Sequence, residues 1–198
     1  MKKKKQRTRK QKALLWAVLS LLLFFLAIHS HTLCLTSGQS IRAVESLYGL
    51  ESTELIAEKG DFTLSENQNT LLLVQHRPFH SPRWNVNGSQ LQVQTKPDHP
   101  VCAIISFRWN SEDPDMRYHL AGTLDLEGAH SVRAYCTPDT EYNGTPLTLT
   151  AEVETTAQGR PYFWSLTILP VGSYVIPQHL DVLDDEGNIL TTTEISWQ

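Results

Sequence analysis

The chain has 198 residues, of which 40% are hydrophobic, and a formal net charge of −4 at pH 7. That charge hides two opposite regions, because 8 of the 17 Lys and Arg residues lie in positions 2–12 and all 21 acidic residues come later. Positions 13–198 carry 9 basic against 21 acidic residues, a net charge of −12, which repels phosphate backbones and argues against nucleic-acid binding. Ordered apolar patterns beyond residue 36 also argue against a disordered chain.

The N-terminal region consists of a basic tail, residues 1–12, and an apolar segment, residues 13–35. As a helix the segment would be about 34 Å long, enough to cross a hydrocarbon core of about 30 Å. Basic residues directly before such a helix keep the N-terminus cytoplasmic. The sequence therefore predicts a single-pass signal-anchor in the cell membrane, with residues 13–35 in the lipid bilayer and the C-terminus extracytoplasmic.

A cleaved signal peptide is the alternative, because it shares the basic start and the apolar run. The run here exceeds the usual length of about 7 to 15 residues, and no A-x-A-like site follows it. Thr36-Ser37-Gly38 is the nearest approximation. Cys34 also lacks the preceding small residues of a lipoprotein cleavage site. These observations favour retention of the segment.

A short amphipathic helix is predicted over 41–48, with Ser40 as its cap and Gly49 as its end. Its apolar residues are Ile41, Val44, Leu47 and Tyr48. The next segment, 51–59, fits either a helical turn closed by Gly60 or a strand that leads to a turn at Gly60 and Asp61. We favour the strand.

The chain beyond residue 60 has the pattern of β structure. Residues 70–76 form an apolar run of strand length, and Asn87-Gly88 is a strong hairpin signal. A two-residue turn there pairs Trp84 with Leu91, so the apolar residues of both strands share one face. A further alternating face comprises Val101, Ala103, Ile105, Phe107 and Trp109.

Polar residues 110–115 interrupt this pattern, and we place a domain boundary there. Residues 36–112 are then an extracytoplasmic α+β region, and residues 113–198 a small antiparallel β-sandwich. Six strands are expected in the second part, over about 120–126, 132–136, 147–153, 162–169, 174–183 and 189–197. The ending LDVLDDEGNIL, residues 180–190, resembles the final hairpin of many immunoglobulin-like extracytoplasmic modules. The fold class is therefore mainly β, with an immunoglobulin-like sandwich expected at the C-terminal end.

Cys102 and Cys136 both fall in predicted strands of the exported part, where disulfides persist. Cys102 lies on the face opposite Val101, whereas Cys136 shares the face of Val132. A disulfide between the two cysteines and two separately buried thiols are both consistent with this pattern. No Cys-His signature supports a catalytic thiol.

The histidines and loop carboxylates are the candidates for catalytic or metal-binding groups. His76 and His80 have the i, i+4 spacing of a helical metal pair, but Pro78 between them indicates a loop. With His99 they could converge on zinc, although no HExxH or second spaced pair accompanies them. The carboxylates that could serve a hydrolase in the same region are Asp98, Glu112, Asp113 and Asp115. We interpret both sets as solvated loop residues.

The remaining polar and aromatic groups have structural explanations as well. Asp181, Asp184, Asp185 and Glu186 lack the order of a calcium loop and fit a hairpin turn. The tryptophans Trp84, Trp109, Trp164 and Trp197 lie in alternating strands, which favours core packing over a sugar platform. Asn87 and Asn143 begin glycosylation sequons that also serve as turns.

The sequence therefore predicts a membrane-anchored extracytoplasmic module that binds a protein or envelope partner, without catalysis and without a cofactor or metal. The alternative is an anchored hydrolase that uses the loop histidines and carboxylates between residues 76 and 115. A hydrolase needs a concave polar site with perturbed titrating groups, whereas a binding module can present a strand edge or an apolar patch.

Overall fold

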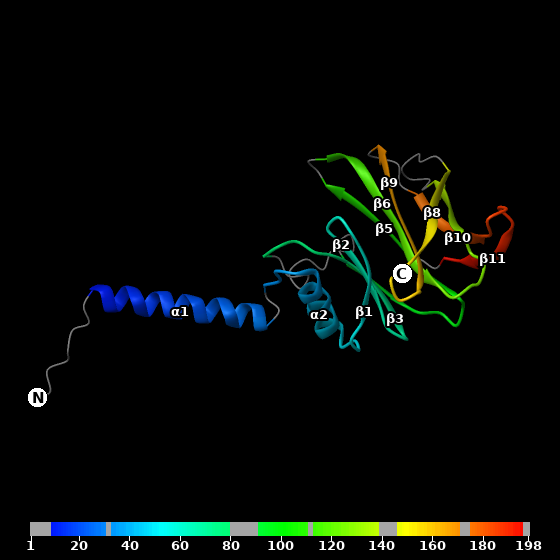
Figure 1. The fold of residues 1–198 in the computed structure, drawn as a ribbon. Helices are drawn as coiled ribbons and strands as arrows, with labels where there is room; N and C mark the ends of the chain where they lie inside the picture. The colour runs from blue at the N-terminus through cyan, green and yellow to red at the C-terminus, as the bar shows by residue number, and fades with distance from the viewer. Residues whose placement is uncertain are drawn as a thin grey trace, which may run out of the picture.

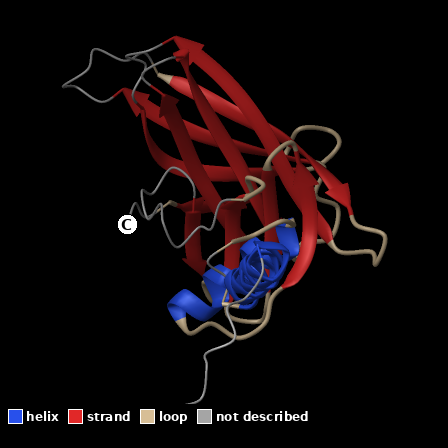
Figure 2. Cartoon of the chain, turned by 90° about the vertical axis from the view of Figure 1, so that its left-hand side faces the viewer, coloured by secondary structure: helices blue, strands red, loops and turns tan. Residues whose placement is uncertain are grey.

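The structure is a computed structural model that describes residues 9–30, 33–79, 91–110, 113–138, 146–170 and 175–195. Side chains are described in these ranges except at 108–110 and 113–114. Over these ranges the chain forms two helices and two antiparallel β-sheets. Figures 1 and 2 show the helices at one side of a body made of strands. A mainly β fold with one apolar and one short helix is thus confirmed.

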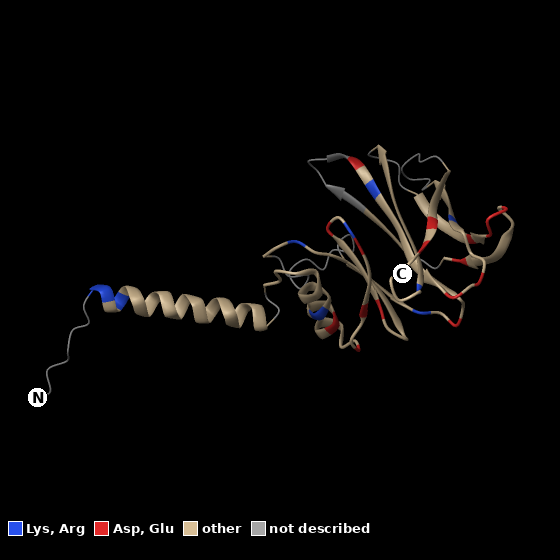
Figure 3. Ribbon diagram, in the orientation of Figure 1, with Lys and Arg blue, Asp and Glu red and all other residues tan. Residues whose placement is uncertain are grey.

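The N-terminal helix α1 (Arg9–His29) projects away from the β body, and none of its residues is buried (Figure 1). It is long and apolar enough to cross a membrane, a property that membrane anchors share with signal sequences. Arg9, Lys10 and Lys12 stand at its start, whereas the acidic residues are spread over the β body (Figure 3). The charge division expected from the sequence is therefore also a division in space.

The second helix, α2 (Ser37–Tyr48), begins four residues earlier than predicted. The Thr36 hydroxyl accepts a hydrogen bond from the Gln39 amide, so Thr36 is the N-cap. The prediction that Ser40 caps the helix is wrong. Residues 37–40 are polar or glycine, so the apolar periodicity from which the helix was predicted does not reach its first turn. The helix ends at Gly49 as predicted, in the left-handed conformation that glycine adopts without strain.

The first sheet has the strand order β1-β2-β3-β4 and covers α2 on one side. Its strands are β1 (Glu54–Lys59), β2 (Phe62–Glu66), β3 (Thr70–Gln75) and β4 (Leu91–Thr95). The strand favoured for 51–59 is confirmed, and it turns into β2 at Gly60, whose φ is 63°. The strand expected at 70–76 is confirmed too. The predicted hairpin turn at Asn87-Gly88, with Trp84, lies outside the described residues.

The second sheet has the order β11-β10-β7-β8-β9-β6-β5. Its strands are β5 (Val101–Asn110), β6 (Asp113–Leu124), β7 (Ser131–Pro138), β8 (Leu147–Thr155), β9 (Pro161–Pro170), β10 (Val175–Leu183) and β11 (Ile189–Glu194). The six strands expected after residue 113 are present, although β6 begins seven residues before the predicted alternation. The predicted boundary at 112/113 falls between the paired strands β5 and β6, and the change of sheet comes between Thr95 and Val101. The immunoglobulin-like character of the sandwich is not confirmed.

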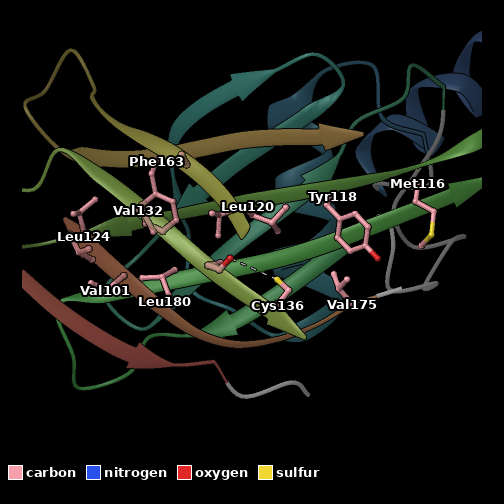
Figure 4. Packing of buried hydrophobic residues seen from close by; sticks show 14 residues of the cluster. Val101, Met116, Tyr118, Leu120, Leu124, Val132, Cys136, Phe163, Val175 and Leu180 are labelled. Carbon is pink, nitrogen blue, oxygen red and sulfur yellow. Dashed lines mark hydrogen bonds between the residues drawn. The ribbon is translucent and has the colours of Figure 1, made fainter. Parts of the chain in front are cut away.

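Three hydrophobic clusters hold the layers together. The first lies within the folded second sheet and contains Tyr118, Leu120, Phe163 and Leu180 (Figure 4). The second lies between the two sheets, where Leu64, Leu71 and Leu73 meet Ile104 and Trp164. The third lies between the first sheet and α2 and contains Val44, Leu72, Val74 and Leu91. The first sheet is therefore the middle layer, and every residue of β3 is buried.

Gly122 lies on β6 at a position where a side chain would not fit. A Cβ atom at this position would lie 2.3 Å from the Cys102 carbonyl oxygen and 2.4 Å from a ring carbon of Phe163. Both distances are shorter than any ordinary contact. The Phe163 ring therefore occupies the space that a side chain at position 122 would need.

Candidate binding surface

The three predicted histidines are not brought together as far as the structure describes them. The His76 ring contacts the hydroxyl of Ser40 on α2 at 2.9 Å. The His99 ring lies 3.1 Å from the hydroxyl of Thr193 on β11 and accepts a hydrogen bond from the Val101 amide. His80 lies outside the described residues. The His76 ring thus links the end of β3 to α2, and the His99 ring links the segment before β5 to β11.

The four carboxylates that could serve a hydrolase are only partly described by the structure. Asp98 and Asp115 are exposed, Glu112 lies outside the described residues, and only the backbone of Asp113 is described. Among the described residues, no three His, Cys, Asp or Glu side chains are grouped so that they could hold a metal ion. The expectations of no enzyme activity, no metal and no cofactor stay predictions.

The acidic cluster near the C-terminus forms the β10–β11 turn, as the sequence predicted. The Asp184 carboxylate accepts hydrogen bonds from the Asn188 side chain and from the amides of Asn188 and Glu186, and these bonds lower its pKa. Asp181 is instead buried and accepts a hydrogen bond of 2.6 Å from the Thr192 hydroxyl. These carboxylates therefore shape the hairpin.

Cys102 and Cys136 are free, buried thiols on opposite faces of the second sheet. The structure thus corresponds to the second of the two alternatives drawn from the sequence, and the candidate disulfide is not formed in it. Burial raises the pKa of Cys102 to about 12 and that of Cys136 to about 11. At neutral pH both sulfurs are protonated, which disfavours nucleophilic chemistry at either one.

Of the predicted tryptophans, Trp164 is buried in the cluster between the sheets, as expected. Trp84 and Trp197 lie outside the described residues, as do Asn87 and Asn143, and the Trp109 side chain is not described. The Trp164 indole donates a hydrogen bond of 3.3 Å to Nδ1 of the buried His119. The Phe62 ring lies 4.2 Å from the His119 ring. Sequence reasoning missed His119, although its place in the alternation of β6 could have indicated a buried outer-face residue.

A polar cavity of about 550 Å³ lies at one end of the junction between the sheets. At its floor the Glu66 carboxylate accepts a hydrogen bond of 2.8 Å from Thr123 and forms an ion pair with Lys96. Arg160 lies 3.8 Å from the same carboxylate and 2.6 Å from Glu54. Both cations thus already meet carboxylates of this chain. The cluster is best understood as a clamp between the two sheets.

A smaller cavity of about 370 Å³ lies at another part of the junction and has mainly apolar walls. Phe62, His119 and Trp164 form its inner part, and Leu166 forms its outer part. At one side, Lys59 pairs with Glu154 at 2.6 Å, and Glu154 accepts a hydrogen bond of 2.5 Å from the Tyr162 hydroxyl. Hydrogen bonds from Lys59, which has the larger effect, and from Tyr162 lower the pKa of the Glu154 carboxyl. This pairing ties β1 to β8 and β9 and holds the wall in place.

The apolar wall continues along β9 onto the surface. Trp164, Leu166 and Ile168 alternate on the outer face of the strand, and their exposure rises from buried at Trp164 to 49% at Leu166 and 53% at Ile168. On the neighbouring strand β6, His119 stands opposite Leu166 and Arg117 opposite Ile168. A row of apolar residues thus leads from the cavity to solvent, and we call Trp164, Leu166 and Ile168 the β9 row.

One edge of β9 is also open along this row. β8 pairs with β9 only from Val153 to Thr155, opposite Phe163 to Pro161, whereas its earlier residues pair with β7. In Figure 1 the two strands diverge from that point. Among the described residues, β9 beyond Phe163 therefore pairs with β6 alone. Apolar side chains and unpaired backbone groups occur together along this half of the strand.

Comparison of the chain with protein-family models, with curated proteins and with solved structures gives no match. The candidate site therefore rests on the chain's own geometry.

Proposed function

We propose that the chain is a membrane-anchored extracytoplasmic module that binds a protein partner of the cell envelope, without catalysis. The basic residues before α1 and the length of the apolar segment support a retained signal-anchor with a cytoplasmic N-terminus. The acidic character of positions 13–198 supports a partner other than nucleic acid. The final hairpin supports an immunoglobulin-like interpretation of the sandwich, which stays a prediction.

The open edge of β9 is the observation that carries the binding proposal. A strand from a partner can extend a sheet by bonding to unpaired backbone groups, and alternate side chains then decide which partner fits. Leu166 and Ile168 would supply apolar contacts on the outer face, and the cavity beside Trp164 would receive a larger side chain. Natural sheets usually protect such an edge with charges or proline, yet between Trp164 and Leu169 the strand has neither.

The arrangement of polar groups favours binding over catalysis. His76 and His99 join separate elements, Glu66 is paired with cations, and the thiols of Cys102 and Cys136 are held protonated. The histidines and Glu66 would have to leave their present partners before they could act as acids or bases. The two thiols would have to lose a proton in a buried environment before they could act as nucleophiles.

Photo-crosslinking in intact cells tests the binding proposal. A photoreactive residue at Ile168 should give a discrete protein adduct, because that position lies on the open edge. Ile189 on β11 is the matched control, since it is the same residue type with a similar exposure of 59%. Ile168→Arg should abolish function in the cell, whereas Ile189→Arg should not. Equal adducts at both positions, or none at 168, would contradict the proposal.

A separate pair of measurements tests topology and retention. A reporter fused after Gln198 should be active only outside the cytoplasm, and the protein isolated from membranes should still contain residues 1–35. An N-terminus near Gln39 would show that the segment is a cleaved signal peptide. A cytoplasmic reporter would overturn the topology itself.

A further inference from the structure

Phe79 has an unusual backbone conformation and an unusual exposure for an aromatic residue. Its φ is 63°, and it is the only residue other than glycine with a positive φ in the described part of the chain. Bulky side chains rarely adopt this left-handed region. The side chain is nonetheless 61% exposed, so no burial of the ring within this chain explains the conformation. Such a residue, strained and presented to solvent, indicates a contact outside the chain.

The backbone around Phe79 is held by contacts to three separate elements. The Phe79 amide donates a hydrogen bond of 2.9 Å to the carbonyl oxygen of Cys34, which is fully buried. Three residues earlier, the His76 amide donates to the carbonyl oxygen of Asp61 at 2.6 Å, and the His76 ring contacts Ser40. The segment His76–Phe79 therefore has a defined position relative to the chain that leaves α1.

That position is next to the end of the apolar helix. The Leu33 amide donates a hydrogen bond of 3.1 Å to the carbonyl oxygen of Ala27 in the last turns of α1. Cys34 follows Leu33 directly, and consecutive Cα atoms are about 3.8 Å apart. The Cys34 carbonyl that binds Phe79 therefore belongs to the residue directly after Leu33, whose amide bonds to the last turn of the helix. If α1 crosses a bilayer, Phe79 lies at the depth of its outer surface.

We propose that the segment His76–Phe79 is a second membrane contact, in which the exposed Phe79 ring enters the boundary between the lipid headgroups and acyl chains. This inference rests on the proposed function, because it needs α1 to be a retained anchor. The interfacial region beyond the hydrocarbon core is about 5 to 8 Å thick on each side, which matches the short distance from the helix end. Apolar residues at this depth bind the acyl boundary. Arg77, two residues earlier, would add a positive charge that can pair with lipid phosphates.

Two attachments restrict the module more than one. A single helix allows the outer part to rotate and tilt about its linker, whereas a ring inserted beside the helix fixes one face of the module toward the lipid. In Figure 1, β11 lies on the side of the β body away from α1. Phe79 would then keep the α2 side of the module on the membrane.

Site-specific fluorescence of the full chain in lipid vesicles tests this contact. Phe79→Cys is labelled with an environment-sensitive dye, and Ile189→Cys on β11 serves as the exposed control. The unsubstituted chain gives the background from its three buried cysteines. The dye at position 79 should be quenched by lipids that carry a nitroxide near the headgroup and protected from iodide in solution. The dye at 189 should show the reverse.

A second variant keeps the test valid if Phe79→Cys disturbs the loop. Pro78→Cys retains the Phe79 ring and reports from the neighbouring exposed position. Phe79→Asn is then added to this variant, because asparagine tolerates the left-handed backbone but lacks the apolar ring. The second change should abolish quenching by the nitroxide lipid, with the melting temperature of the outer part preserved.

The outcomes separate this inference from the proposed function. Flotation of the chain with vesicles at high pH establishes that α1 is an anchor. A floating chain whose positions 78 and 79 are quenched by iodide as strongly as 189 overturns the membrane contact alone. A chain that fails to float overturns the anchor and the contact together.

Discussion

The two buried thiols of the second sheet should make the protein labile to alkali. Burial raises the pKa of Cys102 to about 12 and of Cys136 to about 11, from the usual 9.0. Above pH 9 the unfolded chain loses these protons while the folded chain keeps them, so stability falls as pH rises. The stabilisation that each protonated thiol gives to the folded chain is fully present below pH 9. It is lost as pH rises through 11 for Cys136 and through 12 for Cys102. At pH 10, one unit above the unfolded pKa, ionisation of each thiol in the unfolded chain lowers the unfolding free energy by about 1.4 kcal/mol.

Urea unfolding of the full chain in detergent, with reductant at pH 8 and at pH 10, measures this loss. Cys102→Ala combined with Cys136→Ala lowers stability at both pH values by removing core volume, but it also removes both titrations. The fall in unfolding free energy from pH 8 to pH 10 should therefore be about 2 to 3 kcal/mol larger for the unsubstituted chain. All other side chains are the same in the two proteins, so the comparison isolates the two thiols. An equal fall in both would refute the reasoning.

Three further outcomes are expected from the same structure. Gly122→Ala should destabilise by about 1 to 3 kcal/mol or more, because its Cβ would overlap a carbonyl and a ring. Gly38→Ala in α2, with open space around it, should be neutral or slightly stabilising in the same melts. Lys96→Met should cost about 1 to 3 kcal/mol by leaving the buried Glu66 with a weaker partner, whereas Lys59→Met, from an exposed pair, should cost less than about 1 kcal/mol. Titration of denatured, unreduced protein should find three free thiols per chain, and a count of one would show a disulfide.

Sequence reasoning succeeded where a strand buries only one face. β7 alternates between buried and less buried residues along most of its length, and its period of two was visible in the sequence. Each strand from β7 to β11 was expected close to its observed place. The helix α2 was half predicted, since its apolar stripe begins one turn after its Thr36 cap.

Sequence reasoning failed where a strand is too short to show a clear period or where it begins with charged residues. All five residues of β2 are buried. Its sequence FTLSE alternates apolar and polar residues, but two apolar residues, Phe62 and Leu64, are too few to establish a strand period. The start of β6 at Asp113, Pro114 and Asp115 has the composition of a turn, and only pairing with β5 and β9 makes it a strand.

The candidate site could not be assembled from sequence, because its parts come from distant positions. Phe62 and Trp164 are about 100 positions apart and meet only through the packing of one sheet on the other. The open edge of β9 depends on where β8 leaves it, which no local pattern records. Leu166 and Ile168 are assigned to a strand correctly, but their exposure depends on how far the first sheet covers the second, which no local pattern records.

If the part after α1 is exported as proposed, the order of strands in the second sheet has a kinetic consequence, because that part would emerge from the membrane in chain order. β6 lies between β5, which precedes it directly, and β9, whose paired residues are 39 to 55 positions further along the chain. Pairings at such sequence separation form slowly. During export, the hairpin of β5 and β6 must therefore wait with one unpaired edge and two apolar faces until β9 emerges. During that interval the chain is most prone to aggregate and most dependent on a holding chaperone. Mutations that slow translocation should therefore lower the yield of folded protein more than mutations that only destabilise the completed fold.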